Sequence, residues 1–227
     1  MDVVHIIKTN VANQQRNAAA PKMRQYPLKK PAQNLCVYCG SGPGRNPVYM
    51  AAARRLGSAM VAAGIGLVYG GGSLGLMGEV ARTVLADGGY VTGIIPEFLG
   101  TKERMLTGVN ELIVTKSMHE RKMTMFEQST GFVALPGGIG TLEELTEIST
   151  WAQLDQHAKP IILCNIENYW EPYLTLLKHM RAENFIRAGM EFKMDVVTAA
   201  DDVVPAFEYR LANSHPKVPL EPLREIL

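Results

Sequence analysis

The chain has 227 residues, of which 47% are hydrophobic and 20% are charged, a composition typical of a single globular domain with a sizeable core. The formal net charge is only +1, and no apolar run approaches the roughly 18 to 20 residues that cross a bilayer, so neither nucleic acid nor a membrane is expected as a partner. No apolar segment typical of a secretory signal follows the first residues, and we expect a cytoplasmic location.

The first 33 residues differ from the rest of the chain. Residues 1–33 hold six Lys or Arg side chains against the single acid Asp2, and they show neither helical nor strand periodicity. A segment of this composition buries too little apolar surface to fold by itself. We therefore predict a flexible basic extension over residues 1–33, without an assigned function, and a single domain over residues 34–227.

From residue 35 onward, short apolar or β-branched runs alternate with longer amphipathic stretches. The runs predict strands at residues 35–39, 66–69, 90–95, 111–115, 131–135, 160–164 and 196–198. The stretches predict helices at residues 48–63, 76–87, 118–128, 141–155, 169–183 and 200–211. Strands that alternate with helices favour a parallel sheet covered on both faces. The expected fold is therefore α/β, a Rossmann-like, doubly wound parallel sheet of about seven strands flanked by helices.

Glycines gather in the loops that follow three of the predicted strands, at residues 40–44, 70–75 and 137–140. In a doubly wound sheet, ligands bind beyond the carboxyl ends of the strands, where all three loops would lie. Glycine lets backbone N–H groups approach an anion closely, and the helix that follows adds the positive end of its dipole. Together the three loops predict a ligand that carries a phosphate group.

The second of these loops also matches the dinucleotide pattern G-x-G-x-x-G, at Gly70, Gly72 and Gly75. Glu97 follows Gly75 by 22 residues, which suits an acid that binds the ribose of a dinucleotide. Against this alternative, Glu97 comes after Pro96 at the exit of its strand, and the pattern does not account for the other two glycine loops. A dinucleotide-dependent oxidoreductase is kept as an alternative to a mononucleotide-binding protein.

The third loop runs directly into side chains that can do chemistry. Thr141 stands where a helix N-cap is expected and Glu144 follows three residues later, the spacing of a capping box in which two residues satisfy each other's backbone donors. The same carboxylate, one turn beyond a glycine-rich anion site, would also lie near the ribose of a bound mononucleotide. The pattern leaves both roles of Glu144 open.

Arg121 is the second candidate. It lies in the first turn of the predicted helix 118–128, after Ser117 and Glu120, which form another possible capping box. An Arg in this place can be a surface charge. If the fourth and fifth strands are neighbours, however, its guanidinium would reach a sugar or phosphate held by the third loop. His119, in the same turn, is interpreted as a packed or solvated side chain rather than as an acid or base.

The three cysteines are interpreted as structural. Cys36 and Cys39 have the C-x-x-C spacing of redox and zinc sites, but they belong to an apolar run that predicts a buried strand. The five His residues show no ligand spacing that would complete a zinc site, so no metal is expected. An odd number of cysteines also argues against a disulfide framework.

Three motifs carry a resemblance to a known family. They are Tyr69-Gly70-Gly71-Gly72-Ser73-x-Gly75-Leu76-Met77-Gly78, Met118-His119-Glu120-Arg121-Lys122 and Pro136-Gly137-Gly138-x-Gly140-Thr141-x-x-Glu144. With these motifs in order over residues 35–185, the chain resembles the LOG ("lonely guy") family. Members of that family are cytokinin riboside 5′-monophosphate phosphoribohydrolases, once labelled lysine decarboxylases.

The resemblance implies that residues 34–227 form a nucleotide-binding catalytic domain. It would hydrolyse the N-glycosidic bond of AMP or an N6-substituted adenosine 5′-monophosphate, giving free base and ribose 5-phosphate. Arg121 and Glu144 are the implied catalytic pair. The implied substrate-binding residues are Gly40, Ser41, Gly71, Gly72, Glu103, Met118, Lys122, Gly137, Gly138, Ile139, Gly140, Thr141, Leu142, Glu143 and Thr150. The resemblance implies neither a cofactor nor a metal. It does imply a homodimer or a larger homo-oligomer. The choice between a cytokinin base and plain adenine stays open.

The chemistry of the reaction suits these residue types. Breaking the C1′–N bond builds positive charge on the ribose, and a carboxylate beside it stabilises that charge and orients or deprotonates water. Glu144 fits this role, whereas the residues leave open whether Arg121 binds phosphate, ribose or the departing purine. A non-catalytic nucleotide-binding or carrier protein on the same fold is the main alternative, since the glycine loops suffice for binding alone.

Overall fold

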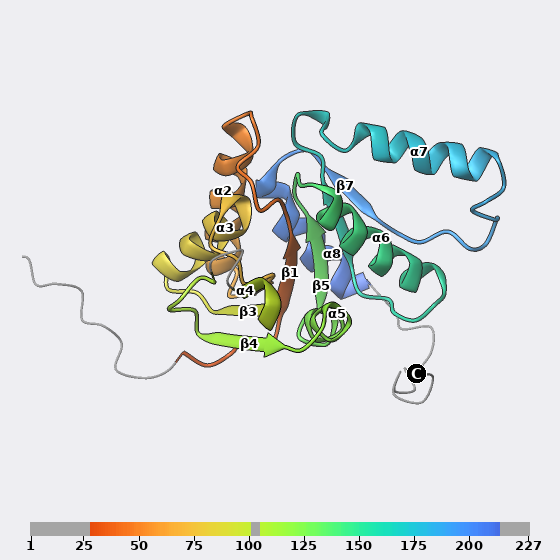
Figure 1. Ribbon diagram of the computed structural model, residues 1–227. Coiled ribbons are helices and arrows are strands. Elements are labelled where there is room, and N and C mark those ends of the chain that lie inside the picture. The colour runs from red at the N-terminus through yellow and green to blue at the C-terminus, as the bar shows by residue number, and fades with distance from the viewer. Residues whose placement is uncertain (1–27, 101–104, 214–227) are drawn as a thin grey trace, which may run out of the picture.

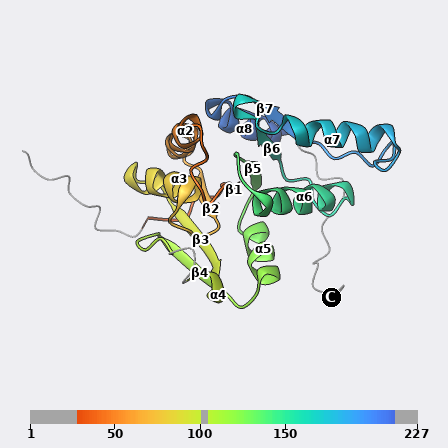
Figure 2. The same cartoon turned by 45° about the horizontal axis from the view of Figure 1, so that its top comes forward.

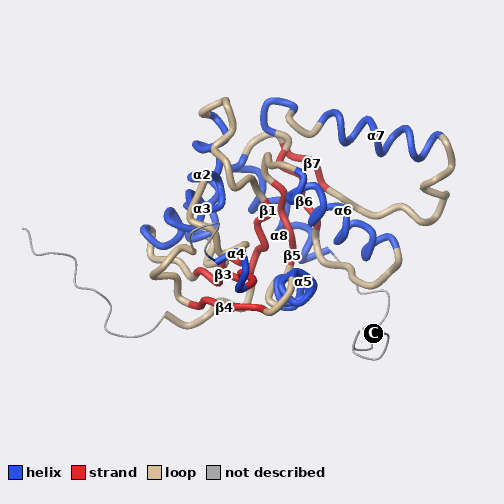
Figure 3. The backbone as a smooth tube through the Cα atoms, viewed as in Figure 1, coloured by secondary structure: helices blue, strands red, loops and turns tan. Residues whose placement is uncertain are grey.

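The computed structural model describes residues 28–100 and 105–213, and in these ranges seven strands form one parallel sheet in the order β4-β3-β2-β1-β5-β6-β7 (Figures 1 and 3). The strands are β1 (Asn34–Tyr38), β2 (Gly66–Tyr69), β3 (Val91–Pro96), β4 (Glu111–Thr115), β5 (Gly131–Ala134), β6 (Ile161–Cys164) and β7 (Asp195–Val197). In register, Leu35 of β1 lies between Leu67 of β2 and Gly131 of β5. The predicted α/β fold and its seven parallel strands are confirmed.

Helices cover both faces of the sheet, as alternating strand residues require (Figure 2). Leu35 and Val37 of β1 pack into an apolar cluster with α2, α3 and α8, whereas Cys36 and Tyr38 face the opposite cluster with α5 and α6. The helices are α2 (Val48–Ala62), α3 (Gly75–Ala86), α4 (Glu97–Gly100), α5 (Met118–Glu127), α6 (Ile139–Gln153), α7 (Glu171–Ala182) and α8 (Val203–Asn213), with 3-10 turns η1 (Ile166–Asn168) and η2 (Ala200–Asp202). No helix in the described ranges is long and apolar enough to cross a membrane.

The predicted elements lie within one to three residues of the observed ones, and the differences of two or three residues all fall at the ends of helices. The short helix α4 was not predicted, because four residues are too few to show a helical period. Helix α6 begins at Ile139 rather than at Thr141, and Gly138 is its N-cap in an extended conformation. The earlier start matters for the site, because it moves Thr141 and Glu144 further into the helix.

The direction of winding reverses between β1 and β5, which are neighbours in the sheet but far apart in the sequence. Chains that leave these two strands turn to opposite sides, which opens a crevice at the carboxyl edge. The loops at residues 40–44 and 137–140 flank this crevice, and Gly40 N–H donates to the carbonyl of Pro136 across it at 3.1 Å. The structure thus brings the first and third glycine loops together.

Helix α5 reaches the same crevice from the far edge of the sheet. The fourth and fifth strands are not neighbours, because β3, β2 and β1 lie between β4 and β5. Instead, α5 connects β4 to β5 by crossing the face of the sheet, where it contacts β3 (Figure 2). The condition under which we expected Arg121 to reach the third loop, that the fourth and fifth strands are neighbours, is therefore not met. The crossover itself nevertheless carries Arg121 to the carboxyl edge, where it meets Glu144.

The last residues of the predicted extension contact the domain. Lys30 Nζ donates to Glu111 of β4 at 2.7 Å and to Gln128 at 2.5 Å, and the carbonyl of Gln33 accepts from Gly66 N–H at the start of β2. Residues 28–33 therefore lie against the N-terminal edge of the sheet, whereas residues 1–27 are outside the described ranges.

Candidate active site

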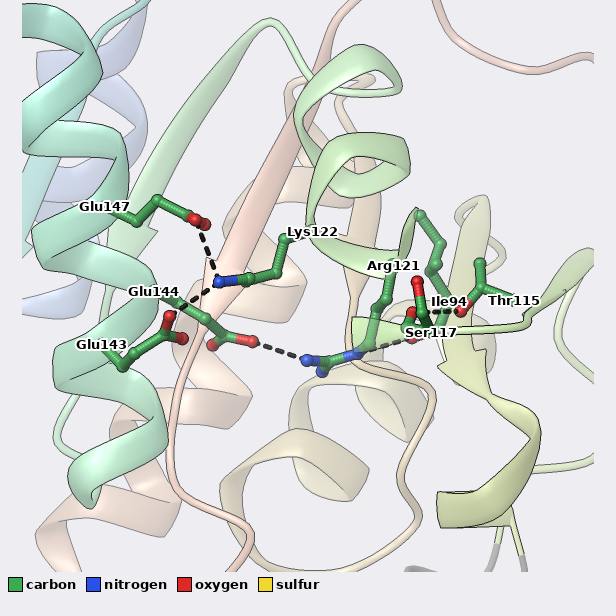
Figure 4. Close-up of polar contacts among 8 residues, drawn as sticks. All are labelled: Ile94, Thr115, Ser117, Arg121, Lys122, Glu143, Glu144 and Glu147. Atoms are coloured by element: carbon green, nitrogen blue, oxygen red, sulfur yellow. Dashed lines mark hydrogen bonds and ion pairs between the residues drawn. The ribbon is translucent and has the colours of Figure 1, made fainter. Parts of the chain in front are cut away.

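Arg121 and Glu144 form an ion pair at the carboxyl edge of the sheet (Figure 4). Arg121 Nη1 donates to Glu144 Oε1 at 2.8 Å, and the two side chains are only 7% and 11% exposed. Arg121 Nε also donates to the carbonyl of Ile94 near the end of β3, at 3.2 Å. A charge-assisted hydrogen bond in so little solvent is strong and directional, so the carboxylate and the guanidinium hold each other in one arrangement.

The capping-box role that we considered for Thr141 and Glu144 is wrong. The helix has no side-chain cap, and with Gly138 as the N-cap, Glu144 lies in the second turn, too far along the helix to reach the first backbone donors. Thr141 is instead buried beneath the loop, where a Cβ on Gly137 would lie only 2.1 Å from its hydroxyl oxygen. The Glu144 carboxylate faces Arg121.

Arg121 is not the surface charge that its helical position allowed. Ser117 caps α5 as expected, since its hydroxyl accepts from Glu120 N–H at 3.1 Å, while the Glu120 carboxylate accepts from Lys116 N–H at 2.7 Å. The cap fixes the first turn, and Arg121 then points inward across the end of β3. A Cβ on Gly70 would lie 2.3 Å from Arg121 Nη2, so glycine at this position makes room for the guanidinium.

The three helices that follow the glycine loops differ in whether their first N–H groups are already paired. At α3, the N–H groups of Leu76 and Met77 both donate to the carbonyl of Gly40, at 3.1 and 3.3 Å. At α2, Asn46 accepts from Val48 and Tyr49 through its side chain and its carbonyl. Because the N–H groups of Leu76 and Met77 at the start of α3 are already bonded to protein, they are not available to a dinucleotide pyrophosphate, which argues against the oxidoreductase alternative.

Helix α6 differs from the other two. Among the residues that the structure describes, no acceptor pairs with the N–H groups of residues 138–141, and the first bonded donor is Leu142, which binds the carbonyl of Gly138. Unpaired donors at the start of a long helix, together with the helix dipole, favour an anion.

A cavity opens beside this helix start, between the first and third glycine loops. Its lining consists of Gly40, Ser41, Gly42, Gly44, Tyr49, Leu76, Pro136, Gly137, Gly138 and Tyr169. Gly42 and Gly138 have no atom within 4 Å of the position that a Cβ would take, so packing does not demand glycine at either place. A side chain at either position would project into the cavity. Glycine there leaves room for a ligand that approaches the backbone closely.

Lys122, next to Arg121, joins α5 to the outer surface of α6 (Figure 4). Its Nζ donates to Glu143 at 2.7 Å and to Glu147 at 2.9 Å. Burial alone would lower the pKa of Lys122, but the hydrogen bonds to the two carboxylates outweigh it and raise the pKa above its usual value. A shallow depression on the same side of α6 is lined by Ile139, Leu142, Glu143, Thr146, Glu147 and Thr150.

Apart from Glu103, the predicted substrate-binding residues fall into three groups. The first lines the cavity or the helix start beside it, namely Gly40, Ser41, Gly137, Gly138, Ile139, Gly140 and Thr141. The second lies along α5 and the outer surface of α6, namely Met118, Lys122, Leu142, Glu143 and Thr150. Gly71 and Gly72 form the third group. They are buried and contact the segment after the undescribed residues, since Gly71 accepts from Leu106 N–H and Gly72 bridges to Met105. Glu103 lies outside the described residues.

Two aromatic residues of the cavity were missed. Tyr49 was assigned only to a helix, and Tyr169 only to the start of another, because nothing in the local pattern distinguishes a tyrosine that faces a ligand cavity from one that packs in the core. Their rings meet edge to face, with centroids 5.7 Å apart. The Ile94 carbonyl was also missed, since backbone groups leave no trace in the sequence.

The cysteines are buried and free, as expected. Burial, with a smaller contribution from the Glu144 carboxylate, raises the pKa of the Cys36 thiol to about 12, and the same causes hold the pKa of Cys39 well above its usual value. In the described ranges, no group of three or more His, Cys, Asp or Glu residues is placed to hold a metal ion.

Known proteins resemble this chain in sequence. A family model described as "Possible lysine decarboxylase" matches residues 77–207. The chain is 49% identical to a probable cytokinin riboside 5′-monophosphate phosphoribohydrolase, LOGL1 of Oryza sativa subsp. japonica, over 154 residues that cover 68% of this chain and 69% of the relative. It is 47% identical to the phosphoribohydrolase LOG of the same organism over 186 residues, which cover 79% and 77% of the two chains. For LOG7 of Arabidopsis thaliana, the identity is 46% and the shares are 68% and 71%.

Solved structures resemble it in fold. The Moco carrier protein from Chlamydomonas reinhardtii aligns with a TM-score of 0.57 at 23% identity, over 82% of this chain and 99% of that one. The molybdenum cofactor binding protein from Rippkaea orientalis gives a TM-score of 0.57 at 22% identity, over 81% and 99%. Identities this low concern the fold alone. The sequence relatives and the family model, by contrast, each span more than half of the chain, and the chain belongs to the LOG family.

Proposed function

We propose that this protein is a nucleotide N-glycosidase that hydrolyses an adenosine 5′-monophosphate, with or without an N6 substituent, to free base and ribose 5-phosphate. The observation that carries the proposal is the Arg121–Glu144 ion pair, which is almost closed to solvent at the carboxyl edge of the sheet. It lies close to the start of α6, where the N–H groups of residues 138–141 have no acceptor among the described residues. The sequence relatives named as cytokinin riboside 5′-monophosphate phosphoribohydrolases support the same reaction.

The phosphate would bind at the start of α6. The N–H groups at residues 138–141 supply donors without the cost of displacing a protein acceptor, and Gly138 lets the anion approach the backbone. From this anchor, the ribose would lie towards the second turn of the helix, where Glu144 stands. Anchoring the phosphate positions C1′ before the reaction begins, which is the main use of binding groups remote from the bond that breaks.

Glu144 would act on the ribose and on water. As the C1′–N bond lengthens, its electrons go to the purine and C1′ becomes cationic, so a facing carboxylate lowers the energy of the transition state. Water then attacks C1′ and gives up a proton, while the departing base gains one. Arg121 holds the carboxylate in place through Nη1, and its remaining N–H groups can bind the ribose or polarise the leaving base.

The test is to incubate the purified protein with AMP and with isopentenyladenosine monophosphate and to assay free base. Release of base from either nucleotide supports the proposal, and the ratio of the two rates gives the base preference. If neither nucleotide loses its base although both bind, the result favours the alternative of a non-catalytic carrier protein.

A variant tests the role of Glu144. Glu144→Gln should reduce kcat by about two to three orders of magnitude while leaving nucleotide affinity nearly unchanged. The matched control Glu208→Gln, on the exposed side of α8, should retain full activity.

Assembly and location complete the proposal. We infer a homodimer or larger homo-oligomer from the family resemblance, and light scattering on the purified protein tests it. A cytoplasmic location stays a prediction from the sequence, to be checked by imaging a tagged protein.

A further inference from the structure

Tyr169 contacts the loop that precedes α6. Its hydroxyl donates to the carbonyl of Gly137, 32 residues away in the sequence. The ring packs edge to face against Tyr49 and against Trp170, with centroid distances of 5.7 and 5.1 Å. Both Tyr169 and Gly137 line the cavity between the glycine loops, and Tyr169 is 39% exposed. Tyr169, whose hydroxyl is hydrogen-bonded to the loop before α6, thus lies at the edge of the proposed phosphate site.

The turn that carries Tyr169 is held in a conformation that few residues adopt. Glu167 and Asn168, directly before it, have φ values of 51° and 56°, in the left-handed region that costs non-glycine residues free energy. The buried Asn165 stabilises this turn, since its Oδ1 accepts from Trp170 N–H at 2.7 Å and its own N–H donates to Val197 of β7 at 2.7 Å. Such a conformation persists only where the surroundings enforce it, and its effect here is to place the Tyr169 hydroxyl at the Gly137 carbonyl.

The loop beneath Tyr169 is anchored on either side, because Gly40 N–H binds the Pro136 carbonyl and Leu142 N–H binds the Gly138 carbonyl. Among the described residues, the peptide between Gly137 and Gly138 has no hydrogen bond other than the one from Tyr169. Gly138 has open space around it and an extended backbone, and its neighbour Gly137 is also a glycine. A pair of glycines has more backbone freedom than any other pair of residues, so it would lose much entropy on binding an anion. The bond from Tyr169 fixes the Gly137 carbonyl, and with it the plane of the peptide whose N–H belongs to Gly138. Donation to the carbonyl also polarises this peptide, which makes the N–H a better donor.

We propose that Tyr169 is a positioning residue that holds the Gly137–Gly138 peptide ready to bind the phosphate of the substrate. The proposal rests on the proposed function, because it assigns the phosphate to the start of α6. Tyr169 acts through the loop, so its loss should weaken binding of phosphate-bearing molecules and leave the chemistry at Glu144 nearly intact.

The experiment compares the wild type with Tyr169→Phe, which removes the hydroxyl and keeps the ring packing. The expected result is a KM for the nucleotide monophosphate about five- to tenfold higher, with kcat changed less than twofold, since one neutral hydrogen bond is lost. The inhibition constant of ribose 5-phosphate should rise by the same factor. Tyr209→Phe, a mostly exposed tyrosine of α8, is the matched control and should change neither quantity. An unchanged KM, or a fall in kcat alone, would overturn the proposal.

A second measurement separates this inference from the proposed function. Binding of inorganic phosphate, followed by ³¹P NMR, needs no turnover, and the Tyr169→Phe protein should bind it about five- to tenfold more weakly than the wild type. If the wild type binds phosphate but releases no base from any nucleotide, the proposed function fails, while the comparison of the two proteins still decides the role of Tyr169. Equal phosphate affinities, or no phosphate binding by the wild type, refute that role.

Discussion

Replacing Gly70 with alanine should disturb the proposed catalytic pair, Arg121 and Glu144, while leaving the fold largely intact. The added Cβ would lie 2.3 Å from Arg121 Nη2, whereas real Cβ contacts are essentially never below 3.0 Å, so the guanidinium must retreat by at least about 0.7 Å. That retreat strains or breaks the 2.8 Å bond to Glu144. A displacement near 1 Å at a reacting group commonly lowers the rate about 100-fold.

The cost in stability should be small by comparison. The atom that clashes is the far end of a flexible side chain, so the backbone need not move, and we expect a loss of about 1 kcal/mol in the free energy of unfolding. Gly131→Ala is the matched control. Its Cβ would meet the Phe207 ring at 2.6 Å in the core at the opposite edge of the sheet, so it should lose stability with little change in kcat.

The assay is release of base under saturating nucleotide, together with urea unfolding of both variants. A Gly70→Ala protein with wild-type kcat would refute the reasoning, because it would show that the position of Arg121 does not limit the reaction. A Gly70→Ala protein that loses activity only in proportion to its folded fraction would refute it equally.

Three further outcomes follow from the buried groups and the loops. Burial lowers the pKa of Lys159 from 10.5 to about 8. Between these two pH values the unfolded chain keeps the Lys159 proton and the folded protein has lost it, so the stability of the wild type rises with pH across that window. Urea unfolding at pH 7.5 and pH 10 should show the wild type gaining stability relative to Lys159→Met, and a constant difference would contradict the burial effect. Cys36 and Cys164, whose pKa values burial raises to about 12, should resist alkylation at pH 8 in the native protein and react after denaturation; rapid native labelling would show that the strands open. Gly75→Ala should lower the free energy of unfolding by more than about 2 kcal/mol, because the φ of Gly75 is +55° and the added Cβ would lie 2.4 Å from the Ser41 backbone. Thermal unfolding measures this loss, and near-native stability would show that the loop can shift.

The fold was predictable because strands and helices differ in period and because glycines mark the strand exits. Buried runs such as residues 66–69 are too short for a helix, and their alternation with amphipathic stretches favours a parallel sheet covered on both faces. The candidate pair was also predictable in kind, since Arg121 and Glu144 belong to motifs at helix starts on one edge of the sheet.

What the sequence could not supply was the order of the strands and the contacts that depend on it. The path of α5 across the sheet decides that Arg121 meets Glu144, and strand order is a long-range property that no local pattern encodes. The start of α6 was misplaced for a related reason. Thr141 is a residue type that often caps helices, but its side chain packs under Gly137 instead, and Gly138 is the N-cap.

The three glycine loops also lock together. The Gly40 carbonyl caps α3, Gly40 N–H binds Pro136, and Gly75 packs against the backbone of Ser41, so each loop is shaped by atoms of another. An insertion or deletion in one of them would leave its partners without acceptors or in collision. In protein engineering, these loops should therefore be transplanted between related proteins only as a set, and during evolution their lengths should have changed together or not at all.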